Sequence, residues 1–341
     1  MSTKWHCGAL GCAFMFLAAA GIPGCDEMNE ELNDGVLKNA VVADDDHIDF
    51  TPVDDEVTFR STVDNGIESN GTRFNGTKFN GTKFNGASLG SGAVSNIQFQ
   101  SGSLLKAFDE VSQSYRTGAQ LANVILDFDV DNVGNGKKLK INSVVQSATQ
   151  PTVYFYDVHN EVSAGNFAAL CLDGASNPTT AIPVPKAYDP DTAARLADTN
   201  ALTWACRGAA IAKGIEWGYV PWTSAEMEDA HEAAVRMIRA DYCGNGVTHT
   251  TNGNAIDVSD KWNIQTPDTT WPIEAKWGPN GAVCLNTPRK LQWDRSSIPC
   301  AASLPYCTSD GTSTGTPNTS ASQYGGLLMT RAVPNNNPSA Y

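Results

Sequence analysis

The hydrophobic pattern of the chain predicts several β-strands between residues 121 and 158. Branched and aromatic residues are concentrated there in short runs, which is typical of strands. Shorter segments of the same kind occur after residue 250. The predicted strands are 121–130, 138–145 and 152–158, with further candidates around Ile256, Ile273 and Val283.

A second hydrophobic pattern, with the period of an α-helix, runs through residues 224–242. Thr223 and Glu226 have the spacing of a capping box at the start of a helix. Arg236 and Arg239, in the later turns, suit the negative end of the helix dipole. This segment is the clearest helix in the sequence, and its apolar positions are Met227, Ala230, Ala234, Ile238 and Tyr242.

Residues 70–104 repeat with a period of five. In the first four units, Thr or Ala stands two places before a large apolar residue, and Asn-Gly follows each of the first three phenylalanines. The pattern resembles the pentapeptide-repeat family, whose members form a square right-handed β-helix in which both of these residues point inward. Basic residues replace the Asp or Asn of that family, so the match is partial. The large apolar positions are Phe74, Phe79, Phe84, Leu89, Val94, Phe99 and Leu104.

Residues 1–24 have the pattern of a signal peptide. Lys4 supplies a positive charge, and the apolar run of residues 8–20 follows it. This run is shorter than the roughly 20 apolar residues that span a bilayer. It leads to residues 22–25 (IPGC), which resemble the lipobox of bacterial lipoproteins, where the peptide is cleaved before a cysteine that then carries diacylglycerol. We therefore expect an exported protein that Cys25 anchors in the cell envelope, on the outer membrane or the periplasmic face; the alternative is an ordinary secretory signal.

Charge is distributed unevenly along the chain. Residues 26–68 contain 14 Asp or Glu and two basic residues, whereas the whole chain has a net charge of −14. An acidic segment with few aromatic residues predicts an extended, solvated tether, which we place at residues 25–69. Residues 308–341 are rich in Ser, Thr, Gly, Asn and Pro, which predicts a tail without fixed structure. The acidity and the lack of a basic patch argue against nucleic acid as a partner.

The cysteines fit an exported domain that is stabilised by disulfides. Of nine cysteines, Cys7 and Cys12 leave with the signal peptide and Cys25 takes the lipid, so six remain within residues 105–307. No Cys-x-x-Cys pair occurs, so we expect no zinc or other metal and no cofactor. Six cysteines allow 15 pairings. A short loop favours Cys300 with Cys307. The other four cysteines still allow several pairings, of which we expect Cys171 with Cys206 and Cys243 with Cys284.

Polar residues in and after the predicted helix are the candidates for chemistry. A histidine paired with a carboxylate can act as a general base, and His231 with Asp241 or Asp257 would form such a pair. A zinc-protease motif is excluded because Val235 stands where the second histidine would be. The other interpretation is structural, with His231 packed on the inner face of the helix and its neighbours bound to backbone groups. The candidate cluster is His231, Arg239, Asp241, Asp257 and Glu274.

Several segments resemble the ADYC domain family, and the resemblance covers roughly residues 120 to 300. The family occurs in exported proteins of myxobacteria and their relatives and has no assigned activity. Its members carry two further cysteines where this chain has Gly214 and Ala234, so the resemblance implies that one disulfide has been lost here. The segments include 206–210 (CRGAA), 216–222 (EWGYVPW), 236–244 (RMIRADYCG) and 274–284 (EAKWGPNGAVC).

These patterns predict an α+β fold: a β-rich, disulfide-stabilised domain with one main helix, preceded by a short β-helix-like tract. Because no catalytic set is complete, we expect a lipid-anchored binding or structural module. Its partners would be the membrane, through the anchor, and an envelope protein or glycan ligand. The alternative is an envelope hydrolase that uses His231 with a nearby carboxylate. The predicted boundaries are 1–24 (signal peptide), 25–69 (tether), 70–104 (repeat), 105–307 (globular domain) and 308–341 (tail).

Overall fold

The chain divides into two compact units, and every residue that the computed structural model describes lies in the second, Val36–Tyr341. The expected signal peptide, nearly all of the expected tether and the repeat up to residue 81 lie outside the described residues. The structure describes residues 67–69, 82–130, 134–173, 175–188, 194–196 and 202–334.

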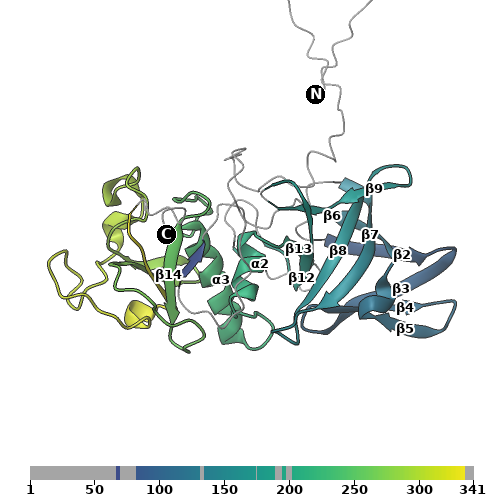
Figure 1. The fold of residues 1–341 in the computed structure, drawn as a ribbon, viewed down its shortest axis with the longest axis horizontal. Coiled ribbons are helices and arrows are strands. Elements are labelled where there is room, and N and C mark those ends of the chain that lie inside the picture. Colours follow the sequence, from purple (N-terminus) through teal and green to yellow (C-terminus); the bar gives the residue numbers. More distant parts are fainter. Residues whose placement is uncertain are drawn as a thin grey trace, which may run out of the picture. The chain divides into compact units, whose positions relative to one another are not determined.

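The larger of two main sheets has ten strands, all paired antiparallel (Figure 1). Its order is β13-β12-β8-β7-β6-β2-β3-β4-β5, and β9 pairs with β8. A further pairing, Leu202 of β13 with Thr82 of β2, closes the first six of these strands into a ring. Apolar residues of the ring, among them Tyr156 and Trp204, pack in one core cluster. The strands are β2 (Thr82–Leu89), β3 (Gly92–Ser101), β4 (Leu104–Asp109), β5 (Ser114–Thr117), β6 (Ile125–Val130), β7 (Gly134–Gln146), β8 (Tyr154–Ser163), β9 (Asn166–Ala169), β12 (Ala181–Pro185) and β13 (Leu202–Cys206).

The second sheet has five antiparallel strands in the order β1-β14-β17-β15-β16. Its strand β17 corrects the prediction of an unstructured tail, because Leu328 is fully buried and the strand lies between β14 and β15. The polar composition of residues 308–341 gave no sign of this strand, because it consists of only four residues, LMTR. The strands are β1 (Ile67–Ser69), β14 (Ala255–Asp260), β15 (Ile273–Gly278), β16 (Gly281–Leu285) and β17 (Leu328–Arg331).

The predicted strands are confirmed within the described residues. The segment 121–130 becomes strand only from Ile125, since the residues before it form a 3-10 turn. The three later candidates are β14, β15 and β16. The remaining short elements are β10 (Cys171–Leu172), paired with β11 (Pro178–Thr179), and the 3-10 turns η1 (Gly118–Leu121), η2 (Arg295–Ser297), η3 (Ala301–Ser303) and η4 (Gln323–Gly325).

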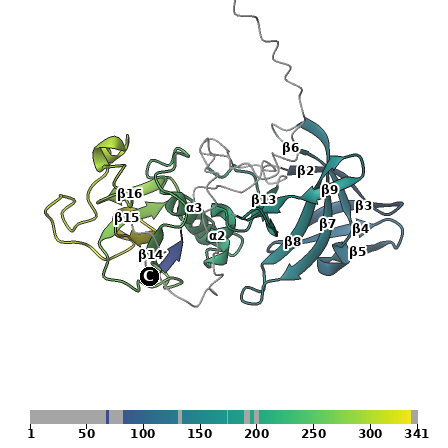
Figure 2. The same ribbon diagram turned by 45° about the horizontal axis from the view of Figure 1, so that its top comes forward.

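The described residues form two α-helices, not one, which lie side by side in both views (Figure 1 and Figure 2). The longer, α3 (Ala225–Arg239), confirms the predicted helix, although Ser224 caps it in place of Thr223, its side chain accepting from the Met227 amide. The shorter, α2 (Ala210–Glu216), has too few residues for its period to be recognised. Helix α3 packs on α2 and on β15 and β16, and its middle and last turns are buried. In the described part of the chain, no helix is long and apolar enough to cross a membrane.

The described part of the five-residue repeat does not form a β-helix. Strands β2, β3 and β4 cover it and pair antiparallel with one another in sequence order. An odd period would place successive large residues on opposite faces of a plain strand. An irregularity in the pairing between Ser95 and Gln98 resolves this conflict, since Val94 and Phe99 both pack in the core of the ring.

Three disulfides link the six cysteines, and two of the expected pairings are wrong. The Cys171–Cys206 bridge is as expected, with a Cα–Cα distance of 5.4 Å. Cys300 and Cys307 are not bonded to each other, because the turn η3 and an extended segment separate them and direct them to different partners. The other two bridges are Cys243–Cys300 and Cys284–Cys307.

The positions of Gly214 and Ala234 face each other across α2 and α3. A Cβ atom built on Gly214 would lie 3.5 Å from the Cβ of Ala234 and 3.1 Å from Cδ2 of His231. Disulfide-bonded cysteines have Cβ atoms about 3.5–4.5 Å apart. This geometry supports the loss of a helix-to-helix bridge that the family resemblance implies.

Candidate functional site

His231 lies in the middle of α3 with no exposed surface. Its Nε2 is 2.9 Å from the carbonyl oxygen of Ile211, and its Nδ1 is 3.2 Å from the hydroxyl of Tyr188. A carbonyl can only accept, so Nε2 carries the proton and Nδ1 accepts from Tyr188. Burial lowers the pKa of His231 to about 4, so the ring is neutral near pH 7. Among the described residues no carboxylate is hydrogen-bonded to this ring, and the predicted pair with Asp241 or Asp257 is absent there.

Asp241 and Arg239 hold the turn that follows α3. Asp241 Oδ2 accepts from Arg236 Nη1 at 2.6 Å and from the Gly246 amide at 2.9 Å, and its Oδ1 accepts from the Asn245 amide at 3.1 Å. Arg239 Nη2 donates to the carbonyl oxygen of Gly246 at 2.9 Å. Both side chains are buried and bound to the same turn. They are the one pair of the candidate cluster that the fold brings together.

Glu274 belongs to a separate buried network. Its Oε1 accepts from Arg289 Nε at 2.7 Å and from the Tyr242 hydroxyl at 2.5 Å. Arg289 also donates to the carbonyl oxygen of Met237 on α3. Glu274 and Arg289 have almost no exposed surface, and burial, with the adjacent carboxylate, raises the pKa of Tyr242. The network joins α3 to β15 inside the core, where no solvent-borne substrate can reach it.

Asp257 closes a loop by itself. It accepts hydrogen bonds from the amides of Asp268 and Thr269 and from the Thr269 hydroxyl, at 2.6–3.0 Å. His249, which contacts the ring of Tyr242, is also held by backbone, with Nδ1 3.2 Å from the carbonyl oxygen of Ala240. The candidate cluster is therefore four separate hydrogen-bonded arrangements, each of which ties backbone segments together.

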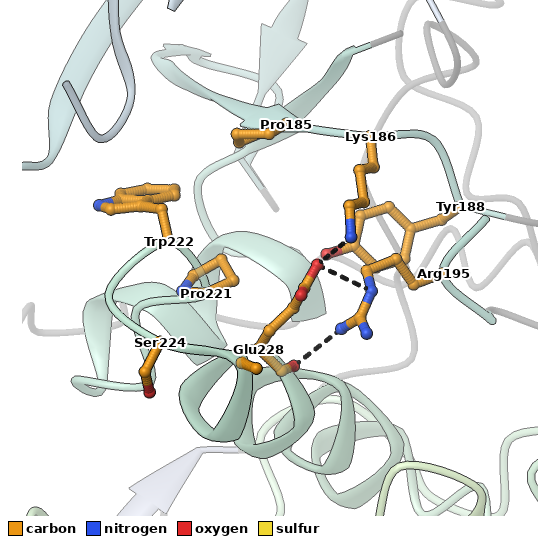
Figure 3. A pocket seen from close by; sticks show the side chains of 9 residues that line it. Pro185, Lys186, Tyr188, Arg195, Pro221, Trp222, Ser224 and Glu228 are labelled. Atoms are coloured by element: carbon orange, nitrogen blue, oxygen red, sulfur yellow. Dashed lines mark hydrogen bonds and ion pairs between the residues drawn. The ribbon is translucent and has the colours of Figure 1, made fainter. Parts of the chain in front are cut away.

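A cavity of about 360 Å³ lies elsewhere, where β12 ends and α3 begins (Figure 3). Proline has no N–H to donate to a neighbouring strand. Strand β12 carries Pro183 and Pro185, and it pairs with β8 only through Ala181. The next residue, Lys186, has a φ of 76°, a left-handed conformation that turns the chain away from the sheet. Such strain in a residue other than glycine is often found at functional sites.

One side of the cavity is charged. Glu228 Oε1 lies 2.5 Å from Lys186 Nζ and 3.0 Å from Arg195 Nε. Arg195 also donates to the backbone carbonyl of Glu228 and lies within 3.6–3.7 Å of Glu232 and Asp229. These side chains are partly exposed, at 27% for Lys186 and 18% for Arg195, so a ligand can reach them.

The other side of the cavity is mostly apolar, and a buried tyrosine also lines it. Figure 3 shows Trp222 and Pro221 across from the charged side chains, with Ser224 on the same side, while Pro185 directly precedes Lys186. The indole nitrogen of Trp222 donates to Thr152 Oγ1 at 3.1 Å, which fixes the ring. Tyr188 is buried and connects the cavity to His231.

Lys186, Arg195 and Glu228 were not predicted from the sequence. Arg195 lies outside any regular element, and Lys186 follows a short strand, so no period marks them. One signal was available. Glu228 and Glu232 stand one helical turn apart, and such a like-charge pair is unfavourable unless a cation lies near both. Arg195 supplies that cation.

The fold and this cavity define a β-rich, disulfide-stabilised α+β domain with a small site of mixed character beside its main helix. The sequence profile of the ADYC domain matches residues 118–291, just over half of the chain. The chain therefore belongs to the ADYC domain family. No curated protein matches it, and no solved structure does. The matched range contains the cavity and the buried networks, whereas Cys300, Cys307 and β17 lie beyond it.

Proposed function

We propose that this chain is a lipid-anchored protein of the bacterial cell envelope whose ADYC domain is a binding module. The cavity between β12 and α3 would hold the ligand. The single observation that carries this proposal is the mixed cavity, with partly exposed charges opposite a fixed indole. Small-molecule sites in proteins have this character, mostly apolar with a few oriented polar groups.

The arrangement of the candidate cluster favours binding over catalysis. A hydrolase with a His231 base needs a carboxylate or another orienting group and a substrate within reach. His231 is instead fully buried and bonded to Ile211 and Tyr188. The carboxylates of Asp241, Asp257 and Glu274 are occupied by structural hydrogen bonds.

The anchor is supported by the sequence of the N-terminus. The IPGC motif at residues 22–25 and the acidic segment after it would place the domain outside the membrane on a solvated spacer. Three disulfides fit an oxidising compartment. In the producing bacterium, Cys25→Ala should abolish acyl labelling and leave uncleaved precursor, whereas the control Cys12→Ala should be labelled normally. Labelling of Cys25→Ala would contradict the anchor.

Binding is tested by thermal melts of the purified full chain in detergent. Saccharide and peptide mixtures prepared from the cell envelope are the probes. A ligand at 100 times its Kd adds about 2.7 kcal/mol of stability, which raises the Tm by several degrees. Trp222→Ala should lose this rise, whereas Trp262→Ala, which changes a tryptophan outside the cavity, should keep it. Equal shifts in both variants, or no shift with any mixture, would contradict a binding module at this site.

A further inference from the structure

We infer, on the basis of the proposed binding function, that the cavity recognises an uncharged sugar residue, with Lys186 and Glu228 hydrogen-bonding its hydroxyl groups and Trp222 packing against its ring. Three features of the cavity support an uncharged sugar as its ligand: its unused hydrogen-bonding capacity, its charge balance and its apolar side.

The unused hydrogen-bonding capacity is a donor next to an acceptor. Within the described part of the chain, the Lys186 ammonium, with three N–H groups, donates one hydrogen bond, to Glu228 Oε1. Both cations bind Oε1, so Glu228 Oε2 receives no hydrogen bond from a described residue. A hydroxyl can accept from Lys186 and donate to Glu228 at once, because it is both donor and acceptor. Carboxylates and ammonium groups lack this dual capacity.

The charges around the cavity largely cancel. Lys186 and Arg195 face Glu228, and Asp229 and Glu232 lie within 4 Å of the Arg195 guanidinium. Of these carboxylates only Glu228 lines the cavity, whereas Asp229 and Glu232 offset the charge of Arg195 from outside it. An anionic ligand would find both cations already paired with carboxylates, and a cationic ligand would meet the same two cations. A neutral polar ligand takes part in the existing ion pairs without disturbing the balance of charge.

The apolar side suits the flat face of a sugar ring. Trp222 is held in place because its indole nitrogen is bonded to Thr152, and Pro221 and Pro185 line the cavity with it (Figure 3). A fixed aromatic surface contributes contact area at little cost in side-chain entropy. The volume of about 360 Å³ lies at the small end of the range for ligand pockets, which matches one or two sugar residues.

The test is titration of the purified full chain, in detergent, with a panel of neutral and acidic mono- to tetrasaccharides and with short peptides of the same size. We expect at least one neutral saccharide to bind. Trp222→Ala and Lys186→Gly should each raise its Kd at least tenfold. Lys186→Gly is chosen because glycine adopts the φ of 76° without strain, so the loop is expected to keep its conformation.

The matched control is a second Trp–Lys–Glu group outside the cavity, formed by Glu226 of α3 and two residues that follow β14. There Glu226 accepts from Lys261 at 2.6 Å and from the indole nitrogen of Trp262, and the Lys261 ammonium lies over the Trp262 ring. Trp262→Ala should leave the Kd unchanged. If only acidic saccharides or only peptides bind, and Trp222→Ala abolishes that binding, the assignment of an uncharged sugar is overturned. The proposal that the domain is a binding module would then still hold. Saccharide binding that survives Trp222→Ala and Lys186→Gly would overturn the assignment to this cavity.

Discussion

The two ends of α3 carry charged residues in opposite circumstances. At its start, Lys186 and Glu228 are partly exposed, so a ligand can reach the hydrogen-bonding groups that described residues do not use. Beyond its end, Glu274 and Arg289 have almost no exposed surface and are bonded to Tyr242 and to the helix backbone. The side chains of the first arrangement can form hydrogen bonds to a ligand. Those of the second are closed to ligands, so a substitution there can only remove bonds that stabilise the fold.

Most of the residues that carry the family resemblance are not the residues that line the cavity. The segment 236–244, which carries the resemblance to the ADYC family, forms the buried end of this helix and the turn held by Asp241. The cavity combines Pro221 and Trp222, from the family segment 216–222, with Lys186 and Arg195, which lie outside those segments. The densest motif in the sequence therefore stabilises the fold, and the accessible chemistry lies at the other end.

The largest expected effect comes from breaking the buried network. Arg289→Met should lower the free energy of unfolding by about 3–5 kcal/mol, because it leaves the Glu274 carboxylate buried without its cation. Urea unfolding measures the loss. At a temperature where the variant is folded, its saccharide Kd should equal that of the wild type. A variant of full stability would contradict the structural role of this end.

Acid should destabilise the domain through the histidine between the two ends. The pKa of His231 is lowered by burial to about 4, from 6.5 for an exposed histidine. The unfolded chain therefore binds a proton that the folded chain does not as the pH falls from 6.5 to 4, and stability falls over that window by about 3 kcal/mol. Urea melts between pH 7 and 4 should show this loss, and His231→Gln should remove it. A variant with an unchanged acid slope would contradict the neutral, buried histidine.

Restoring a bridge between α2 and α3 should stabilise the helix pair. The double variant Gly214→Cys/Ala234→Cys should form a disulfide, because the two Cβ positions are 3.5 Å apart. Closing a loop of this length contributes about 2–3 kcal/mol, reduced by any strain against the His231 ring. Melting with and without reductant gives the difference, and the single Gly214→Cys variant is the control. Two free thiols in the oxidised double variant would show that the helices are placed differently.

The smallest stability effect is expected at the edge of the cavity. Lys186→Gly loses an ion pair of a partly exposed side chain but relieves the left-handed backbone, so stability should stay within about 1 kcal/mol of wild type. Lys186→Ala loses the same ion pair and keeps the strain, so it should be less stable than the glycine variant. Thermal melts of both variants compare them directly. Alanine more stable than glycine at this position would contradict the strained conformation.

The sequence predicted elements with a strong period and missed contacts between distant segments. Helix α3 was found because its apolar positions repeat every three to four residues, and β14–β16 because their residues are branched or aromatic. The disulfide pairing was predicted for one bridge of three. The others could not be predicted, because the distance between residues such as Cys243 and Cys300 depends on how two loops meet. Strand β17 was not predicted because it has only four residues and the sequence on either side of it is mostly polar.

The candidate site shows the same limit more sharply. Sequence patterns identified His231, Asp241 and Glu274 as polar residues near conspicuous motifs, but burial and hydrogen bonding decide whether such residues are accessible. Lys186 and Glu228 are 42 positions apart and meet only after folding. Trp222 lies in the family segment 216–222, and only the structure distinguishes it as the tryptophan that lines the cavity within the described residues.

The most direct test of the account is to observe the indole N–H groups of the ¹⁵N-labelled full chain by NMR while a neutral saccharide that binds is added. The signal of Trp222, assigned with Trp222→Phe, should move to saturation, because the ligand packs against a ring whose nitrogen is bonded to Thr152. The signal of Trp277, which stacks on Tyr242 in the buried network, should stay in place. Movement of Trp277 with Trp222 unchanged would contradict the account, since it would place the ligand at the buried end of α3.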